Sequence, residues 1–270
     1  MTVMRDNYML EEIVAFKAVE TAQRKSHHSL GSLERRIADA RAPRAFAQAI
    51  ATSSVAVIAE AKYRSPSKGV LRADYDPLAL AHAYQAGGAS ALSVLADSRF
   101  FGNAPYVVGL LANAPGLNLP VMYKDFIVDE FQVYEARALG ADAILIIVRI
   151  LSPETFRRLY TLALELGLDV LVETFDEADI DQALSVGAGI VGINNRDLDT
   201  FKVNFDRTAE LFELLPGQVI GVAESGISGV ADFNRINTIG FRAALMGEYL
   251  LGAEDPTRQL RFLTAGGDPN

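Results

Sequence analysis

Residues 55–69 read VAVIAEAKYRSPSKG, and the rest of the chain repeats the pattern that this segment begins. It opens with an apolar, largely β-branched run, which is typical of a buried strand. The run ends at Glu60 and Lys62, and a turn-forming loop at residues 65–69 follows. In parallel α/β proteins, ligands bind at this carboxyl end of the strands. A lone Glu-x-Lys pair is more often a structural ion pair, so the other strand ends decide between a structural and a catalytic interpretation.

The composition is that of a globular protein with a large core. Of the 270 residues, 50% are hydrophobic, which suits an α/β barrel built as one domain. The 34 acidic residues exceed the 25 basic ones, and this excess argues against nucleic acid or an anionic membrane as a partner. With no cysteine and only 3 histidines, neither a disulfide nor a metal site is expected. The sequence has no membrane-spanning or targeting pattern, so we expect a cytoplasmic protein.

Short apolar segments alternate with helical segments from residue 55 onward. The apolar segments begin at residues 55, 91, 119, 142, 169, 189, 218 and 242. Asp76, Ser152 and Asp176 look like helix N-caps, and glycines stop the helices before the next strand. Repeated strand–helix units form a parallel sheet, and eight of them close naturally into a (β/α)₈ barrel of the α/β class. A doubly wound sheet usually has fewer strands and a glycine-rich phosphate loop after the first.

The first 54 residues precede the repeats and form a helical leader. Its apolar spacing predicts an amphipathic helix over residues 8–24, and two shorter helices follow at residues 33–40 and 46–50. We expect one domain over residues 1–270, in which the leader of residues 1–54 covers the barrel mouth. A contact between subunits is the alternative role for this leader.

Residues 187–192, GAGIVG, match the dinucleotide-binding pattern G-x-G-x-x-G. That motif must follow a strand and open a helix, whereas these residues end a helix and enter a strand. The match therefore carries no nucleotide-binding prediction.

Charged and polar side chains gather at the expected strand ends. They are Glu60 and Lys62, Lys124 and Asp125, Glu173, the group Asn194, Asn195 and Arg196, and Glu224 with Ser225. A barrel brings these ends to one face, and burying uncompensated ions together is too costly for a purely structural cluster. A buried protonated lysine can donate to a carbonyl or a leaving hydroxyl, and a nearby carboxylate can take the proton back. Ion pairs between Lys124 and Asp125 and between Lys62 and Glu60 are compatible with that role.

Glycine-rich turns follow the last two strands, at residues 224–229 and 246–248. Barrels commonly bind phosphate there, through backbone N–H groups. Ser65 and Lys68 of the first loop are placed to close such a site, although the loop could also be a plain surface turn. Phe101 and Phe126 flank the charged mouth, where they could stack on a planar ring or simply pack.

Several long motifs resemble those of the indole-3-glycerol-phosphate synthase family. They are AEAKYRSPSKG at 59–69, ALSVLADSRFFGN at 91–103, the segment 120–147, LVETFDEAD at 171–179, GINNRDLDTFKVN at 192–204 and VAESGIS at 222–228. The resemblance covers nearly the whole chain and implies a (β/α)₈ barrel with an N-terminal helical extension over the active-site mouth. It also implies conversion of 1-(2-carboxyphenylamino)-1-deoxyribulose 5-phosphate to indole-3-glycerol phosphate, CO₂ and water, without metal or cofactor. Association with other tryptophan-pathway enzymes is a further expectation.

The resemblance also implies a role for each site residue. Lys124 is the general acid for ring closure, Lys62 binds the anthranilate carboxylate and is an acid in dehydration, and Glu173 is the second acid/base group. Glu60, Asn194 and Glu224 orient the substrate and the lysines, Arg196 lies near the carboxylate end, and Ser225 lies near the reacting centre. Ser65, Gly226, Gly247 and Glu248 hold the phosphate, and Phe101 and Phe126 wall the aromatic pocket.

The chain departs from the family pattern at a few positions. Met122 and Tyr123 replace a leucine and a basic residue, Ala61 and Tyr63 replace residues expected to be larger or basic, and Glu248 stands where a small hydroxyl residue can occur. None of these removes a named catalytic group. Two other functions remain as alternatives: a phosphoribosyl-anthranilate isomerase or similar sugar-phosphate isomerase, and a non-catalytic barrel that binds a phosphorylated ligand.

Overall fold

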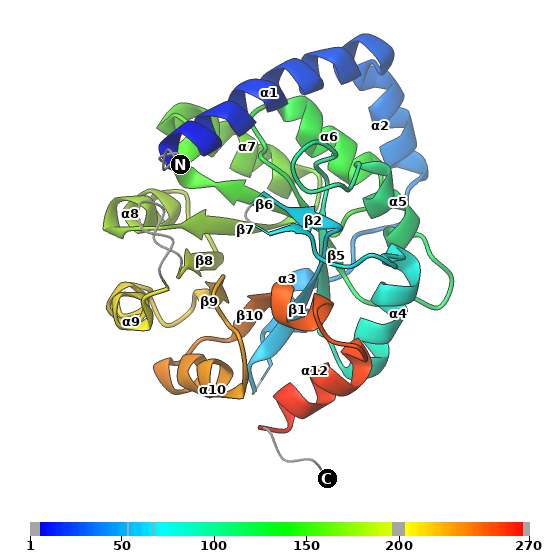
Figure 1. Cartoon of the computed structure of the whole chain (residues 1–270). Helices are drawn as coiled ribbons and strands as arrows, with labels where there is room; N and C mark the ends of the chain where they lie inside the picture. The colour runs from blue at the N-terminus through cyan, green and yellow to red at the C-terminus, as the bar shows by residue number, and fades with distance from the viewer. Residues whose placement is uncertain (1–5, 53, 67, 196–202, 267–270) are drawn as a thin grey trace.

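A computed structural model describes residues 6–52, 54–66, 68–195 and 203–266. Parallel strands form one closed barrel, so the predicted fold class is confirmed (Figure 1). In spatial order the strands are β1 (Ala56–Ala61), β10 (Ala243–Met246), β9 (Ile220–Glu224), β8 (Ile190–Asn194), β7 (Asp169–Thr174), β6 (Ala143–Ile147), β5 (Val121–Lys124) and β4 (Ala91–Leu95), which pairs again with β1. Each corresponds to one strand predicted from the sequence.

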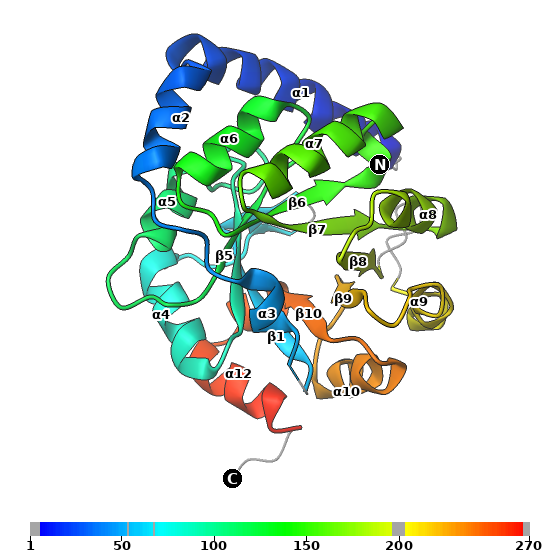
Figure 2. The same ribbon diagram turned by 180° about the vertical axis from the view of Figure 1, so that it is seen from behind.

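Helices surround the barrel on all sides (Figures 1 and 2). They are α4 (Pro77–Gly87), α5 (Tyr106–Ala112), α6 (Glu130–Ala138), α7 (Pro153–Glu165), α8 (Glu177–Ser185), α9 (Phe205–Phe212), α10 (Val230–Ile239) and α12 (Pro256–Thr264). Shorter elements are the hairpin of β2 (Arg64–Ser65) and β3 (Gly69–Val70), the 3₁₀ turn η1 (Val148–Ile150) and α11 (Glu248–Leu251). The predicted N-caps Asp76, Ser152 and Asp176 are confirmed, because each side chain accepts a backbone N–H of the following turn.

Alternation along the strands decides which side chains enter the barrel. In β1, Val57 and Ala59 pack against the surrounding helices, whereas Ala56 and Ile58 face the barrel interior. Glu60 continues the interior series because side chains of a strand alternate between its two faces. The same alternation takes Lys124 inward after Met122. The apolar interior therefore ends in charged residues at the carboxyl ends of the strands.

The leader forms α1 (Asp6–His27), α2 (Leu30–Asp39) and α3 (Phe46–Ile50), close to the predicted ranges. Phe46 and Ile50 of α3 are fully buried against the interior residues at the amino ends of the strands, and Figure 2 shows α3 across this end. Helix α1 instead forms ion pairs with residues just beyond the carboxyl ends of β4 and β5. The leader therefore contacts both ends of the barrel. Within the described residues, no helix combines the length and the apolar character needed to cross a membrane.

Candidate active site

A cavity of about 860 Å³ opens at the carboxyl ends of the strands. Its lining includes most of the predicted site residues: Glu60, Lys62, Ser65, Phe101, Lys124, Phe126, Glu173, Asn194, Ser225, Gly226, Gly247 and Glu248. Glu224 is 1% exposed and lies in the barrel interior next to them. Arg196 lies outside the described residues. The barrel therefore brings together residues that are far apart in the sequence.

Glu60 joins the two candidate catalytic lysines. Its Oε2 lies 2.9 Å from Nζ of Lys124 and its Oε1 lies 2.5 Å from Nζ of Lys62. Burial by itself raises the pKa of Glu60, but the charges and hydrogen bonds of both lysines outweigh it and lower that pKa to about 2. Burial lowers the pKa of Lys124, but Glu60, Glu224 and Glu173 outweigh it and raise that pKa. Lys124 is therefore a protonated donor at neutral pH.

The sequence suggested an ion pair for each of the two lysines, and one of these two predictions is wrong. Lys62 pairs with Glu60, as expected. Lys124 pairs with Glu60 rather than with Asp125, whose carboxylate binds Lys17 of α1 at 2.8 Å. Lys124 and Asp125 are neighbours in sequence and project in different directions, so their adjacency did not make them partners.

Glu173 of β7 and Glu224 of β9 lie near each other at the carboxyl ends of their strands. Asn194 donates from Nδ2 to Oε1 of Glu173 at 3.2 Å. Burial, followed by the neighbouring Glu173 carboxylate, raises the pKa of Glu224 well above its ordinary value. Burial and a neighbouring carboxylate both favour the protonated form of Glu224 over its ionised form. The strand ends thus offer the ammonium group of Lys124 and, near it, the two carboxyl groups of Glu173 and Glu224.

Two glycines leave space for these carboxyl groups. A Cβ on Gly192 would overlap Oε1 of Glu224, and a Cβ on Gly247 would lie 2.5 Å from Oε1 of Glu60. Gly192 is the last glycine of the pattern at residues 187–192, which carries no nucleotide-binding prediction. Sequence reasoning missed its role because the contact joins two strands of the closed barrel. A glycine within an apolar strand is the signal that could have found it.

We expect Gly192→Ala to lower kcat about 10- to 100-fold, because the new methyl group displaces the Glu224 carboxyl from Glu173. Overpacking should also lower the free energy of unfolding by about 1–3 kcal/mol. Steady-state kinetics and urea unfolding measure the two effects. Gly189→Ala is the matched control, since a Cβ there meets no atom within 4 Å. Parent-like kcat in the Gly192 variant would contradict this reading of the contact.

The turn after β9 holds Ser225 in an unusual conformation. Its φ is 64°, in the left-handed region that non-glycine residues seldom adopt. Nδ2 of Asn195 donates to the Ser225 carbonyl at 2.8 Å, and Oδ1 of Asn195 accepts from Oγ1 of Thr208 at 2.6 Å. Asn195 is 4% exposed, so these bonds fix the turn from inside the protein. Sequence reasoning placed Asn195 at the strand end and gave it no role.

The loops after β1, β9 and β10 contain the residues predicted to bind phosphate. Gly226 has a φ of 75° in the turn after β9, and Gly247 lies between β10 and α11. Lys68 forms an ion pair with Glu248 at 2.7 Å, and its backbone N–H donates to Oγ of Ser65 at 3.3 Å. The ion pair joins the loop after β1 to the first residue of α11, and the hydrogen bond to Ser65 lies within the loop after β1.

Phe101 and Phe126 lie in the neighbouring loops after β4 and β5, and the Phe101 carbonyl accepts the backbone N–H of Arg64 at 3.1 Å. The ring centroids of Phe101 and Phe126 are 6.2 Å apart, and the planes are inclined by 32°. Both residues line the cavity, Phe101 in the loop after β4 and Phe126 in the loop after β5. The two rings form an apolar wall beside Lys124.

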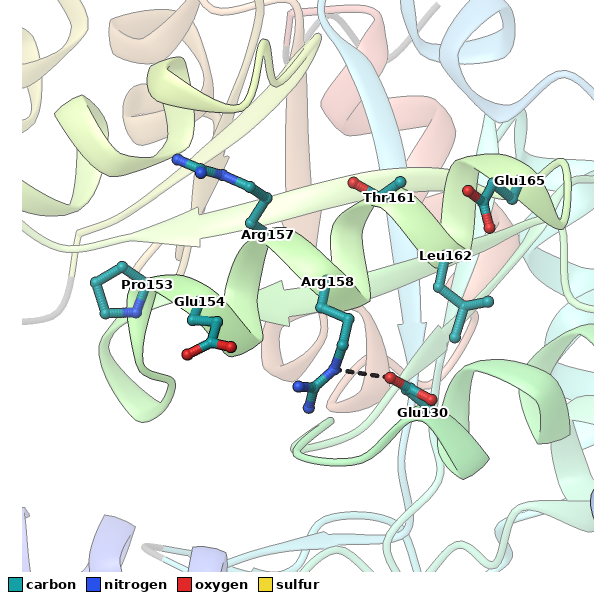
Figure 3. Close-up of a pocket in the computed structure, with 8 residues that line it drawn as sticks. All are labelled: Glu130, Pro153, Glu154, Arg157, Arg158, Thr161, Leu162 and Glu165. Carbon is teal, nitrogen blue, oxygen red and sulfur yellow. Dashed lines mark ion pairs between the residues drawn. The ribbon is translucent and has the colours of Figure 1, made fainter.

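A second hollow, of about 620 Å³, lies on the outer surface of the barrel between α6 and α7. It is lined by Glu130, Pro153, Glu154, Arg157, Arg158, Thr161, Leu162 and Glu165 (Figure 3). Arg158 and Glu130 form an ion pair of 2.7 Å across it, and both side chains remain largely exposed. None of the predicted site residues is in this hollow, which separates it from the cavity at the strand ends.

Solved structures share the barrel architecture. Thiamine phosphate pyrophosphorylase from Pyrococcus furiosus aligns with a TM-score of 0.59 at 16% identity, over 78% of this chain and 95% of that one. A structure described as native KDPGal aligns with a TM-score of 0.60 at 18% identity, over 80% and 95% of the two chains. At these identities the similarity concerns the fold alone.

Sequence comparisons are more specific. The family model for indole-3-glycerol phosphate synthase matches residues 10–263. An indole-3-glycerol phosphate synthase of Chloroherpeton thalassium is 44% identical over 250 residues, 91% of this chain and 95% of the relative. The enzyme of the same description from Nocardioides sp. is 43% identical over 256 residues, 95% of this chain and 98% of the relative. Because the family model matches residues 10–263 and both relatives align with more than nine-tenths of the chain, the chain belongs to the indole-3-glycerol phosphate synthase family.

Proposed function

We propose that the cavity at the strand ends converts 1-(2-carboxyphenylamino)-1-deoxyribulose 5-phosphate to indole-3-glycerol phosphate, with Lys124 as the general acid. The observation that carries this assignment of roles is the buried ion pair between Lys124 and Glu60, at 2.9 Å, facing the cavity. It keeps the ammonium group charged and oriented. The overall reaction is that of the family, whose model matches the chain, and it makes the protein a carboxy-lyase.

Ring closure forms a carbon–carbon bond between the aromatic carbon that bears the carboxylate and the carbonyl carbon of the substrate. The electron pair of the carbonyl moves onto its oxygen, and Lys124 supplies the proton for that oxygen. Loss of CO₂ then returns the electrons of the broken bond to the ring and restores its aromaticity. Lys62 is 2.5 Å from Glu60 and lines the cavity beside Lys124, where it can bind the departing carboxylate.

Dehydration breaks the bond to the new hydroxyl group, which leaves as water after it takes a proton. Lys62 is our candidate for that acid, and Glu173 removes the proton that completes the indole ring. Glu224 and Asn194 position Glu173, and Glu60 positions both lysines. Because the pKa of Glu224 is raised, Glu224 holds a proton more readily, and Glu173 is our candidate for the base of the pair.

Substrate orientation follows from the loops around the cavity. Phe101 and Phe126 would hold the aromatic ring, and Arg196 would meet the carboxylate end. Ser65, Gly226, Gly247 and Glu248 would bind the phosphate, with Ser225 near the reacting centre. Glu248 can serve through its backbone N–H, because its side chain is paired with Lys68. We expect the protein to act in the cytoplasm, with association with other tryptophan-pathway enzymes as a further prediction.

The decisive test is to mix the purified chain with the carboxyphenylamino substrate and follow indole fluorescence. The chain contains no tryptophan, so the product signal has no indole background from the protein. We expect indole-3-glycerol phosphate and an equal amount of CO₂. An isomerase would release no CO₂, and a barrel that only binds phosphorylated ligands would bind the substrate without turnover. Either result would overturn the proposal.

We expect Glu224→Gln to stabilise the protein at pH 7 while lowering its activity. The folded protein holds a proton that the unfolded chain releases near pH 4, so this group favours folding most at low pH and loses that contribution as pH rises. Glutamine cannot ionise, so it removes the loss of folding stability that Glu224 causes at neutral pH. We expect a gain in the free energy of unfolding of at least about 1.4 kcal/mol, the value of one pKa unit. Urea unfolding at pH 7 and at pH 4 tests this, because the difference between parent and variant should shrink at the lower pH. An equal difference at both pH values would show that the pKa of Glu224 is the same in the folded and unfolded chain.

A further inference from the structure

Lys17 is a fully buried lysine in α1 that the reaction leaves without a role. Its ammonium group lies 2.7 Å from Oε2 of Glu20, 2.8 Å from Oδ2 of Asp97 and 2.8 Å from Oδ1 of Asp125. The side chain of Lys17 and those of both aspartates are 0% exposed. Burial lowers the pKa of Lys17, but Asp125 and Asp97 outweigh it and raise that pKa, so the lysine remains charged. Three carboxylate oxygens thus match the three N–H bonds of one ammonium group.

The two aspartates lie beside the aromatic wall of the active site. Asp97 follows β4, and its Oδ1 accepts the backbone N–H groups of Phe100 at 2.5 Å and of Phe101 at 3.2 Å. Asp125 follows Lys124 directly, and its Oδ1 accepts the backbone N–H of Phe126 at 2.9 Å. The carboxylates that hold Lys17 therefore also hold the main chain at both ring-bearing residues. Lys17 connects the two loops at the point where each presents its ring to the cavity.

Other contacts also anchor α1. Phe16 packs edge-on against Phe100 with centroids 5.8 Å apart, and Lys25 pairs with Asp129 at 2.6 Å on the exposed surface. Helix α1 also lies beside α6 in both views (Figures 1 and 2). Such surface contacts would suffice if the role of Lys17 were only to hold α1 against the barrel. Burying an ammonium group costs far more than an exposed pair, so its location between the two ring-bearing loops calls for an additional explanation.

We propose that Lys17 is a positioning residue for the reaction, which sets the Phe101–Phe126 wall through Asp97 and Asp125 so that the aromatic end of the substrate is held against Lys124. This inference rests on the proposed function. It assigns to α1 a specific effect on aromatic-ring binding and ring closure, and none on phosphate binding. The predicted phosphate residues belong to the loops after β1, β9 and β10, whereas the two aspartates that hold Lys17 belong to the loops after β4 and β5.

The test compares two ligands in Lys17→Met and Asp97→Asn. Indole-3-glycerol phosphate carries an aromatic ring and a phosphate, whereas inorganic phosphate probes the phosphate site alone. We expect each variant to weaken binding of the indole ligand by at least about tenfold and to change phosphate binding by less than about twofold. In both variants we expect KM for the carboxyphenylamino substrate to rise. We expect kcat to fall as well, because ring closure depends on the same orientation of the aromatic ring. Asparagine retains an acceptor for the amides of Phe100 and Phe101, so Asp97→Asn tests the link to Lys17 if Lys17→Met fails to fold.

Lys25→Met is the matched control on the same helix, since it removes only the exposed pair with Asp129. It should leave both ligand affinities and kcat unchanged. Parallel loss of indole and phosphate binding in the Lys17 and Asp97 variants would assign this cluster to general stability and overturn the proposal, as would parent-like binding of both ligands. Turnover by the unmodified chain is measured separately: its absence would remove the proposed function, whereas turnover with unaltered ring binding in the variants would remove only the role of Lys17.

Discussion

Lys124→Met is expected to lower kcat by about 10³-fold, within the range of 10²–10⁴ found for general acids. Methionine keeps much of the length of the side chain and removes the proton donor. The carbonyl oxygen of the substrate then develops negative charge without a partner in a site that excludes much of the water. Methionine also loses the ion pair that holds the ammonium group of Lys124 at 2.9 Å from Glu60.

Indole fluorescence under single-turnover conditions measures this effect, because product release does not limit the signal. Lys62→Met is the informative comparison, since we expect it to raise KM for the carboxylate-bearing substrate as well as to lower kcat. Urea unfolding of both variants checks that Glu60, left with one lysine in either case, does not unfold the barrel. Retention of a tenth or more of the parent kcat by Lys124→Met would exclude Lys124 as the general acid.

Asp142→Ala is expected to destabilise the protein by about 3 kcal/mol, the lower part of the range for breaking a buried ion pair. Asp142 is 0% exposed and binds the leader segment between α2 and α3. Its Oδ1 lies 2.6 Å from Nη1 of Arg41 and 2.6 Å from the backbone nitrogen of Arg44. Its Oδ2 accepts the backbone N–H of Val121 at 2.8 Å. The two arginines still reach water, which places the expected loss below the upper end of the range.

Urea unfolding followed by circular dichroism gives the free energy of unfolding for this variant. Arg158→Ala is the control, because it removes an arginine–carboxylate pair that lies on the surface between α6 and α7 (Figure 3). An exposed pair contributes about 1 kcal/mol or less, so the control should unfold near the parent midpoint. Equal losses in the two variants would show that burial of Asp142 adds nothing to the anchoring of the leader.

The order of strands and helices could be predicted because its determinants are local. Apolar runs of strand length, N-caps such as Asp76 and Ser152, and terminal glycines act within a few residues of where they stand. Strand ends in a parallel barrel share one face, so the gathering of Glu60, Lys124 and Glu173 in one cavity also followed from the sequence. The long motifs that resemble the family include these strand ends, so the family could also be identified from the sequence.

Tertiary structure alone decided which of these groups touch. Glu60 meets a lysine 64 residues away, and Glu224 occupies the space left by a glycine on the neighbouring strand. Asp125, adjacent to Lys124, binds Lys17 of the leader instead. Such contacts depend on barrel closure and strand register, which long-range packing fixes and no local pattern encodes. The sequence by itself thus determined the strands, their helices and the residues at the mouth, whereas the closed barrel determined their partners and with them the raised pKa values of Glu224 and Lys124.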